Sequence, residues 1–116
     1  MLIAEDDDSL RALLRLSIDV GGLEIAETAD GTSALDLARE SPPDLVLLDW
    51  MMPGLSGLDL CRALRADPKT AGATIVMVTA RAMARDRDAA LAAGADHYVA
   101  KPFSPGALLE TVRHAL

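Results

Sequence analysis

Two short, wholly apolar runs constrain this 116-residue chain more than any other feature of its sequence. They are residues 45–48 (Leu-Val-Leu-Leu) and 75–78 (Ile-Val-Met-Val), and each is followed by a stretch with helical periodicity. A strand that is apolar on both sides must be covered on both faces of its sheet. Alternation of such strands with amphipathic helices predicts βα units around a parallel sheet. We therefore expect an α/β fold with these two runs at its centre.

Three further runs complete the pattern, and they are weaker or shorter. The five predicted strands are residues 2–4, 25–28, 45–48, 75–78 and 98–100. Helical patterns follow each strand, and the fourth extends from Met83 to Ala93 before Gly94. Ser104-Pro105 supplies a cap and a first-turn proline for the last helix. The chain is thus predicted to hold five βα units in one domain, residues 1–116.

The first and last predicted helices each have one apolar face at helical spacing. In the first helix the face consists of Leu10, Leu13, Leu14 and Ile18, and in the last of Leu108, Leu109, Val112 and Leu116. We expect Asp8 or Ser9 to cap the first helix and Gly21-Gly22 to end it. In the fourth helix, Arg and Asp alternate over residues 85–88. This alternation is most simply a solvated face, and it could also contribute to a partner surface.

Charge and composition exclude several classes of function. The net charge of −7 argues against direct nucleic-acid binding, which needs a basic surface, and 3% aromatic residues leave no stacking platform. No apolar run is long enough to span a bilayer, and no secretory signal is visible. The single cysteine, Cys61, rules out an internal disulfide. A cytoplasmic location without membrane partners is the expectation.

Polar side chains stand where four of the predicted strands end. Strand one is followed by the acidic run 5–8, strand three by Asp49, strand four by Thr79-Ala80 and strand five by Lys101. In an open parallel sheet these carboxyl ends meet at one edge, where ligands bind. Chance placement of one acid there would mean little, but the combined set indicates a site.

The chemistry of this set favours magnesium and phosphoryl transfer. Carboxylates about 5 Å apart would repel by roughly 3 kcal/mol at an effective dielectric of about 20, which a bound cation would relieve. Oxygen ligands without cysteine or histidine suit Mg²⁺ rather than zinc. Asp49 could then attack phosphorus, while Lys101 neutralises the transferring oxygens, Thr79 donates a hydroxyl and Ala80 leaves space. Because no glycine-rich loop is present to hold ATP, the phosphoryl donor must be a separate molecule.

Taken together, these residues resemble the receiver domains of bacterial two-component response regulators. The resemblance covers the whole chain and is carried by Leu2-Ile3-Ala4-Glu5-Asp6-Asp7, by residues 44–54 (Asp-Leu-Val-Leu-Leu-Asp-Trp-Met-Met-Pro-Gly), by Val78-Thr79-Ala80 and by Lys101-Pro102-Phe103. Thr79 follows Asp49 by 30 residues and Lys101 follows Thr79 by 22, which is the usual spacing in that family. The fold it implies is a flavodoxin-like (βα)5 doubly wound sheet with strand order 2-1-3-4-5.

The resemblance also implies roles for individual residues. Asp49 would accept a phosphoryl group from a histidine kinase or a histidine phosphotransfer protein. Glu5, Asp6, Asp49 and the backbone carbonyl of Met51 would hold Mg²⁺. Lys101, Thr79 and Ala80 would surround the phosphoryl group, and Tyr98 would turn inward as the switch residue. Such a phosphoprotein is a signalling domain and not an enzyme, because it catalyses only its own phosphoryl transfer and dephosphorylation.

For the second acid and for Tyr98, the sequence leaves an alternative open. Asp7 could replace Glu5 as the second acid, although Glu5 and Asp6 directly follow the apolar strand, and Asp8 is then left to cap the helix. Tyr98 could be an ordinary aromatic residue of an edge strand. Met51 could obstruct the water that would hydrolyse the phosphoryl group and so lengthen its lifetime. His97 and His114 are interpreted as surface residues.

The output is the least constrained part of the prediction. Phosphorylation is expected to change the face formed by the fourth helix, fifth strand and fifth helix, and so to control a target protein or an attached output domain. A phosphorylation-dependent homodimer would use this face, but Ala107 and Thr111 stand where dimerising receivers usually have charges. Two rivals remain. A haloacid-dehalogenase-type phosphatase normally has a second Asp where Met51 stands, and a degenerate receiver that only binds proteins would lack part of the site.

Overall fold

The computed structural model describes residues 1–18, 24–81 and 83–115. Its elements, in chain order, are β1 (Leu2–Ala4), α1 (Asp8–Ile18), β2 (Ala26–Thr28), α2 (Gly31–Glu40), β3 (Leu45–Leu48), α3 (Gly57–Ala66), β4 (Thr74–Thr79), α4 (Ala84–Ala93), β5 (His97–Ala100) and α5 (Pro105–Ala115). The five strands form one parallel sheet in the order β2-β1-β3-β4-β5. The predicted α/β fold and strand order are therefore confirmed.

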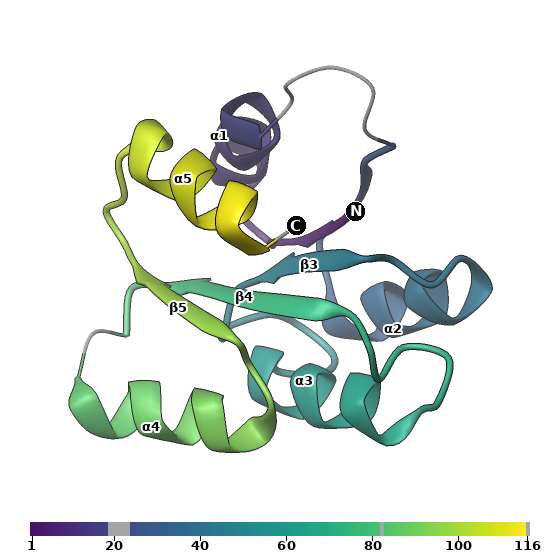
Figure 1. Cartoon of the computed structure of the whole chain (residues 1–116). Coiled ribbons are helices and arrows are strands. Elements are labelled where there is room, and N and C mark those ends of the chain that lie inside the picture. The colour runs from purple at the N-terminus through teal and green to yellow at the C-terminus, as the bar shows by residue number, and fades with distance from the viewer. Residues whose placement is uncertain (19–23, 82, 116) are drawn as a thin grey trace.

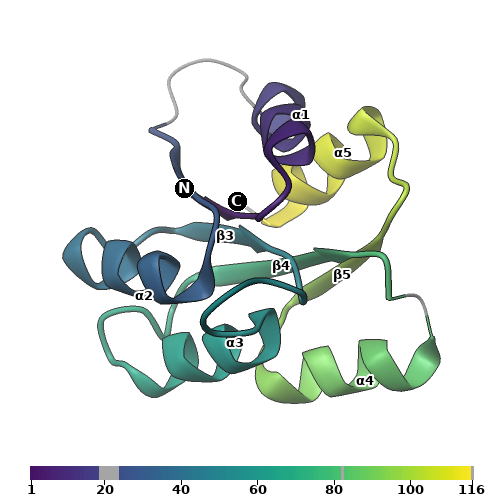
Figure 2. The same ribbon diagram turned by 180° about the vertical axis from the view of Figure 1, so that it is seen from behind.

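Helices cover both faces of this sheet, as Figure 1 and the reverse view in Figure 2 show. Helices α1 and α5 lie on one face, and α2, α3 and α4 lie on the other. In β3, Leu45 and Leu47 join the core beneath α1 and α5, whereas Val46 and Leu48 join the core beneath the other three helices. This alternation is the pleat of a strand buried on both sides, and it explains why the run is apolar throughout.

Side-chain caps fix the beginnings of several helices. The carboxylate of Asp30 accepts a hydrogen bond from the Ser33 amide at 2.7 Å, and the hydroxyl of Ser56 accepts one from the Asp59 amide at 3.2 Å. Ser104, predicted as the cap of the last helix, accepts a hydrogen bond from the Ala107 amide at 3.0 Å. These contacts satisfy amide groups that would otherwise lack a partner.

The cap of α1 differs from the prediction. The amide of Leu10 donates to the carboxylate of Asp7 at 2.9 Å, and Asp8 is the first residue of the helix. Asp7 therefore caps α1, and neither Asp8 nor Ser9 does. A cap must precede the first helical residue, and α1 begins at Asp8, one residue sooner than a cap at Asp8 would allow.

The apolar faces of α1 and α5 are only partly buried. In α1, Leu14 is buried, but Leu13 is 40% exposed. In α5, Leu108 and Val112 are buried as predicted. The predicted end of the first helix at Gly21-Gly22, the side chain of Ile18 and Leu116 lie outside the described residues.

Strand β3 has the predicted bounds, and the other strands and α4 differ from the prediction by at most one residue at either end. Strand β4 extends one residue further at each end than the apolar run, and β5 begins at His97. Met83 precedes α4 without a side-chain cap, and Gly94 ends that helix with φ +115°. Cys61 is fully buried on α3, where its thiol contacts the Ala93 carbonyl at 3.4 Å. No helix among the described residues is long and apolar enough to cross a membrane.

Candidate functional site

The carboxyl ends of β1 and β3 bring the first acids together. The two strands are in register from Leu2 with Val46 to Ala4 with Leu48. The ladder continues one step further, because the Asp49 amide donates to the Ala4 carbonyl at 3.1 Å. Glu5 and Asp49, one residue beyond their strands, therefore lie side by side. Both side chains are buried, with 1% of Glu5 and 8% of Asp49 exposed.

Lys101 reaches the same point from the end of β5. The Lys101 amide donates to the Thr79 carbonyl at 2.8 Å, which extends the pairing of β4 with β5 beyond the strands. Its ammonium group lies 2.7 Å from Oδ2 of Asp49 and 3.1 Å from Oε1 of Glu5. One cation thus binds two carboxylates that are 96 and 52 residues away in sequence. Topology alone creates this contact.

The two buried carboxylates differ in their ionisation. Burial and the adjacent Asp49 raise the pKa of Glu5 to about 7, although Lys101 opposes the shift. Burial also acts against ionised Asp49, but hydrogen bonds with Glu5, Lys101 and Thr79 outweigh it and hold the pKa of Asp49 below its usual value. For Lys101, the interactions with Asp49 and Glu5 outweigh burial, and the pKa of its ammonium group is raised. Asp49 is therefore the more readily ionised of the two carboxyl groups, and ionisation is what a carboxylate nucleophile needs.

Magnesium fits the acids at this edge. Oxygen atoms of Glu5, Asp6 and Asp49 lie within 4.8 Å of one another. Oε2 of Glu5 is buried and has no hydrogen-bond partner among the described residues, which is costly unless a proton or a cation binds it. Asp6 is exposed, so an ion held there would keep part of its water shell. Mg²⁺ favours this combination of a few carboxylates with waters.

The rest of the predicted site lies around Asp49. Thr79 is buried at the end of β4, and its hydroxyl is one of the groups that lower the pKa of Asp49. Ala80 follows it and is exposed. Met51 has an exposed side chain, with 62% of its surface accessible. Tyr98 packs against the core beneath α2, α3 and α4, and its hydroxyl donates to the backbone carbonyl of Arg81.

Asp7 does not belong to the group of described acids whose oxygens lie within 4.8 Å of one another, and its Oδ1 instead accepts the Leu10 amide as the cap of α1. Glu5, the buried neighbour of Asp49, is therefore better placed than Asp7 to be the second acid of the site. The amide of Trp50 donates to Oδ1 of Asp49 at 2.6 Å and so fixes the plane of that carboxylate. This contact was not predicted, because it depends on how the chain turns after β3.

A close approach of backbone atoms supports that turn. The Gly57 amide donates to the Trp50 carbonyl at 2.8 Å, which joins the start of α3 to the end of β3. A Cβ atom at Gly57 would lie 2.0 Å from the carbonyl oxygen of Asp49. Only glycine permits this contact, so Gly57 sets the path of the chain next to Asp49.

Two residues near the site have contacts that the sequence interpretation missed. The guanidinium of Arg81 lies 4.6 Å from the centroid of the Trp50 ring and 3.1 Å from Oδ1 of Asp86. Asp86 is 8% exposed, so it does not belong to the solvated face predicted for residues 85–88. The only sequence signal was the place of Arg81 two residues after Thr79.

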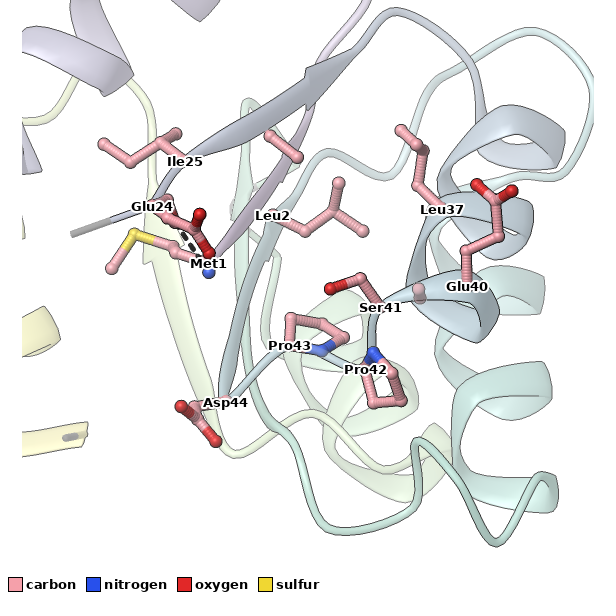
Figure 3. A pocket seen from close by; sticks show the side chains of 12 residues that line it. Met1, Leu2, Glu24, Ile25, Leu37, Glu40, Ser41, Pro42, Pro43 and Asp44 are labelled. Atoms are coloured by element: carbon pink, nitrogen blue, oxygen red, sulfur yellow. Dashed lines mark hydrogen bonds between the residues drawn. The ribbon is translucent and has the colours of Figure 1, made fainter.

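Two cavities lie at opposite ends of the sheet. One of about 350 Å³ borders the acidic site, and its lining is Leu10, Leu13, Ala80, Lys101, Pro102 and Phe103. The other, of about 630 Å³, opens where β1 and β2 begin and where α2 runs into β3 (Figure 3). Leu2 and Leu37 form part of its wall, and Glu40 and Asp44 stand at its margin. The larger cavity is thus remote from the clustered acids and Lys101.

Comparison with known proteins identifies the family. The family described as "Response regulator receiver domain" matches residues 1–113. The chain belongs to this family. It is 43% identical over 114 residues to the phosphate regulon transcriptional regulatory protein PhoB of Rhizobium meliloti (strain 1021), covering 98% of this chain and 50% of that protein. It is 46% identical over 116 residues to the DNA-binding response regulator MtrA of Mycolicibacterium paratuberculosis, covering 100% of this chain and 50% of that protein.

Solved structures agree with this assignment of the receiver domain. A putative response regulator from Chloroflexus aurantiacus J-10-fl superposes with a TM-score of 0.92 at 35% identity, covering 98% of this chain and 93% of that one. The chemotaxis response regulator CheY4 of Vibrio cholerae gives 0.91 at 29% identity, covering 99% and 96%. The receiver domain spans about half the length of PhoB and MtrA. The resemblance seen in the sequence is confirmed, and with it membership in two-component signalling, where magnesium and a phosphorylated protein are typical.

Proposed function

We propose that this receiver domain is a phosphorylation-activated switch in which Asp49 accepts a phosphoryl group in a magnesium-dependent reaction. The single observation that carries the proposal is the contact of Lys101 with Asp49 at 2.7 Å and with the buried Glu5 at 3.1 Å. This arrangement keeps a nucleophilic carboxylate ionised next to a cation. It is the charge distribution that phosphoryl transfer requires.

Each residue of the site would have its own role in phosphoryl transfer. One oxygen of Asp49 attacks the phosphorus of the donor, a P–O bond forms, and the bond from phosphorus to the leaving group breaks. With a phosphohistidine donor the leaving group is the imidazole nitrogen. The Trp50 amide holds the Asp49 carboxylate in place, and Lys101 turns from the carboxylates toward the phosphoryl oxygens. Thr79 supplies a hydroxyl to the same group.

Glu5, Asp6, Asp49 and the backbone carbonyl of Met51 would hold the metal. When bound, Mg²⁺ supplies positive charge that offsets the charge on the carboxylates and on the phosphoryl oxygens. The orphaned Oε2 of Glu5 would then gain a partner, directly or through water. This supports Glu5 as the second acid of the site.

The donor is proposed to be a histidine kinase or a histidine phosphotransfer protein. The cavity lined by Leu10, Leu13 and Phe103 offers apolar surface next to Lys101, where a protein donor could pack while its phosphohistidine reaches Asp49. Output through the face of α4, β5 and α5 is part of the same proposal. A target protein, or an attached output domain such as those of DNA-binding relatives, would bind that face and respond to its change.

Mass measurement after incubation with acetyl phosphate tests the proposal. We expect one phosphoryl adduct with Mg²⁺ and none in EDTA. Asp49→Ala should abolish the adduct, whereas Asp59→Ala, which removes an exposed acid on α3, should leave it unchanged. An adduct that persists in Asp49→Ala would refute the assignment of the acceptor. Sizing of both forms would show whether a homodimer accompanies phosphorylation.

A further inference from the structure

Arg81 connects the neighbourhood of Asp49 to the first turn of α4. Its amide donates to the hydroxyl oxygen of Thr79 at 3.3 Å, and its carbonyl accepts the hydroxyl of Tyr98. Both contacts use backbone atoms, so they are independent of the arginine side chain. They place Arg81 one hydrogen bond from Thr79, which itself interacts with Asp49.

Among the described residues, the guanidinium contacts two groups and is not bound to the acceptor. It lies over the Trp50 ring at 4.6 Å from the centroid, and Nη2 lies 3.1 Å from Oδ1 of Asp86. Trp50 is the residue whose amide binds Asp49 at 2.6 Å, so the guanidinium stacks on the chain neighbour of the acceptor. The Arg81 side chain is 42% exposed, which leaves it room to move.

Asp86 is unusual for an acid in a helix rich in exposed charges. Its side chain is 11% exposed, and Arg81 is its ion-pair partner among the described residues. Met83 is the residue before α4 and forms no side-chain cap, so no such contact fixes the first turn of the helix. A carboxylate in the first turn of a helix is favourable near the helix amides even without a partner, which limits the cost of losing Arg81.

We propose that Arg81 is a phosphoryl ligand shared between two anions: Asp86 holds it in the unmodified protein, and the phosphoryl group on Asp49 takes it over. A phosphoryl group brings about −1.5 to −2 charges and three acceptor oxygens, whereas Asp86 offers one charge. A guanidinium binds phosphate oxygens in a bidentate manner, which favours the exchange. No covalent bond changes in this step. The consequence is that phosphorylation releases Asp86 and the start of α4.

This inference rests on the proposed function, and it predicts opposite effects for the two partners of the ion pair. The probe is beryllofluoride with Mg²⁺, a phosphoryl analogue that would bind Asp49, titrated by ¹⁹F NMR. Arg81→Met should weaken its binding about tenfold, the value of one charge-assisted hydrogen bond. Arg81→Lys should recover part of the loss. Asp86→Asn should tighten binding several-fold, because the competitor for Arg81 is gone.

The double variant and a control acid separate exchange from simple charge effects. In the Arg81→Met background, Asp86→Asn should have no further effect. Asp88→Asn, which removes an exposed acid from the same helix, should change binding little. Equal tightening by Asp86→Asn in both backgrounds, or weakening by both single variants, would overturn the shared-ligand proposal. If the unsubstituted protein takes up neither beryllofluoride nor a phosphoryl group, the proposed function itself fails.

Discussion

Arg65 joins α3 to the neighbouring parts of the fold on the same face of the sheet. It lies on α3, and its guanidinium bonds to four groups outside that helix. Nε donates to the Gly94 carbonyl at 3.0 Å, and Nη1 donates to the carbonyls of Ala71 and Ala73 at 2.7 and 2.5 Å. Nη2 forms an ion pair with Asp96 at 2.7 Å. One side chain thus links α3, the loop before β4, the end of α4 and the approach to β5.

Arg65→Met removes all four donors while keeping most of the aliphatic bulk. A hydrogen bond to a charged group is worth about 1.5–3 kcal/mol, and a buried carbonyl left without a partner costs about 1–3 kcal/mol. The Arg65 side chain is 24% exposed, so water replaces part of what is lost. We therefore expect the free energy of unfolding to fall by about 2–4 kcal/mol. For a domain of this size that lowers Tm by roughly 10–20 °C.

Urea unfolding followed by far-ultraviolet circular dichroism measures this loss. The matched control is Arg62→Met on the same helix, where the arginine is 59% exposed and pairs only with the exposed Asp59 at 3.3 Å among the described residues. Its loss should cost less than about 0.5 kcal/mol. Arg65→Lys should recover little, since an ammonium group cannot reproduce the planar fork. If Arg65→Met and Arg62→Met agree to within about 0.5 kcal/mol, the linking role of Arg65 is refuted.

Three further predictions follow from the site. Because the pKa of Glu5 is raised to about 7, protein in EDTA should lose up to about 3 kcal/mol of stability between pH 4.5 and just above 7. Urea midpoints should show this fall, Glu5→Gln should flatten it, and an unchanged slope in that variant would exclude Glu5 as its source. Gly57→Ala should lower both stability and labelling by acetyl phosphate, because the new Cβ atom would lie 2.0 Å from the Asp49 carbonyl oxygen. Gly106→Ala is the control: this glycine lies in a helix with open space around it, so the substitution should stabilise the protein by up to about 1 kcal/mol. Comparable labelling of the two variants would contradict the steric argument. If the exposed Met51 side chain obstructs the attacking water, Met51→Asn should shorten the lifetime of the phosphoryl group several-fold. Mass measurement of the decaying adduct tests this, and an unchanged decay rate would refute the role of Met51.

Local sequence signals were enough for most of the architecture. The apolar runs at residues 45–48 and 75–78 predicted strands covered on both faces, and both strands lie inside the sheet with a neighbour on each side. Turn and cap residues such as Ser104 and Gly94 marked helix ends, because their chemistry acts within a few residues of the backbone. The errors were of the same local kind. Asp7 caps α1 where Asp8 or Ser9 was expected, since the helix begins one residue earlier than expected while β1 ends at Ala4 as predicted.

What the sequence by itself determined is which residues end the strands, namely Glu5, Asp49, Thr79 and Lys101, and hence which chemistry can occur there. Only the tertiary structure decided how those groups interact. It buries Glu5 against Asp49 under one ammonium group, which sets their pKa values. It also turns Asp86 from an expected surface charge into the buried partner of Arg81. Burial and charge pairing depend on strand order and helix placement, which residues far apart in the chain fix together and no local pattern contains.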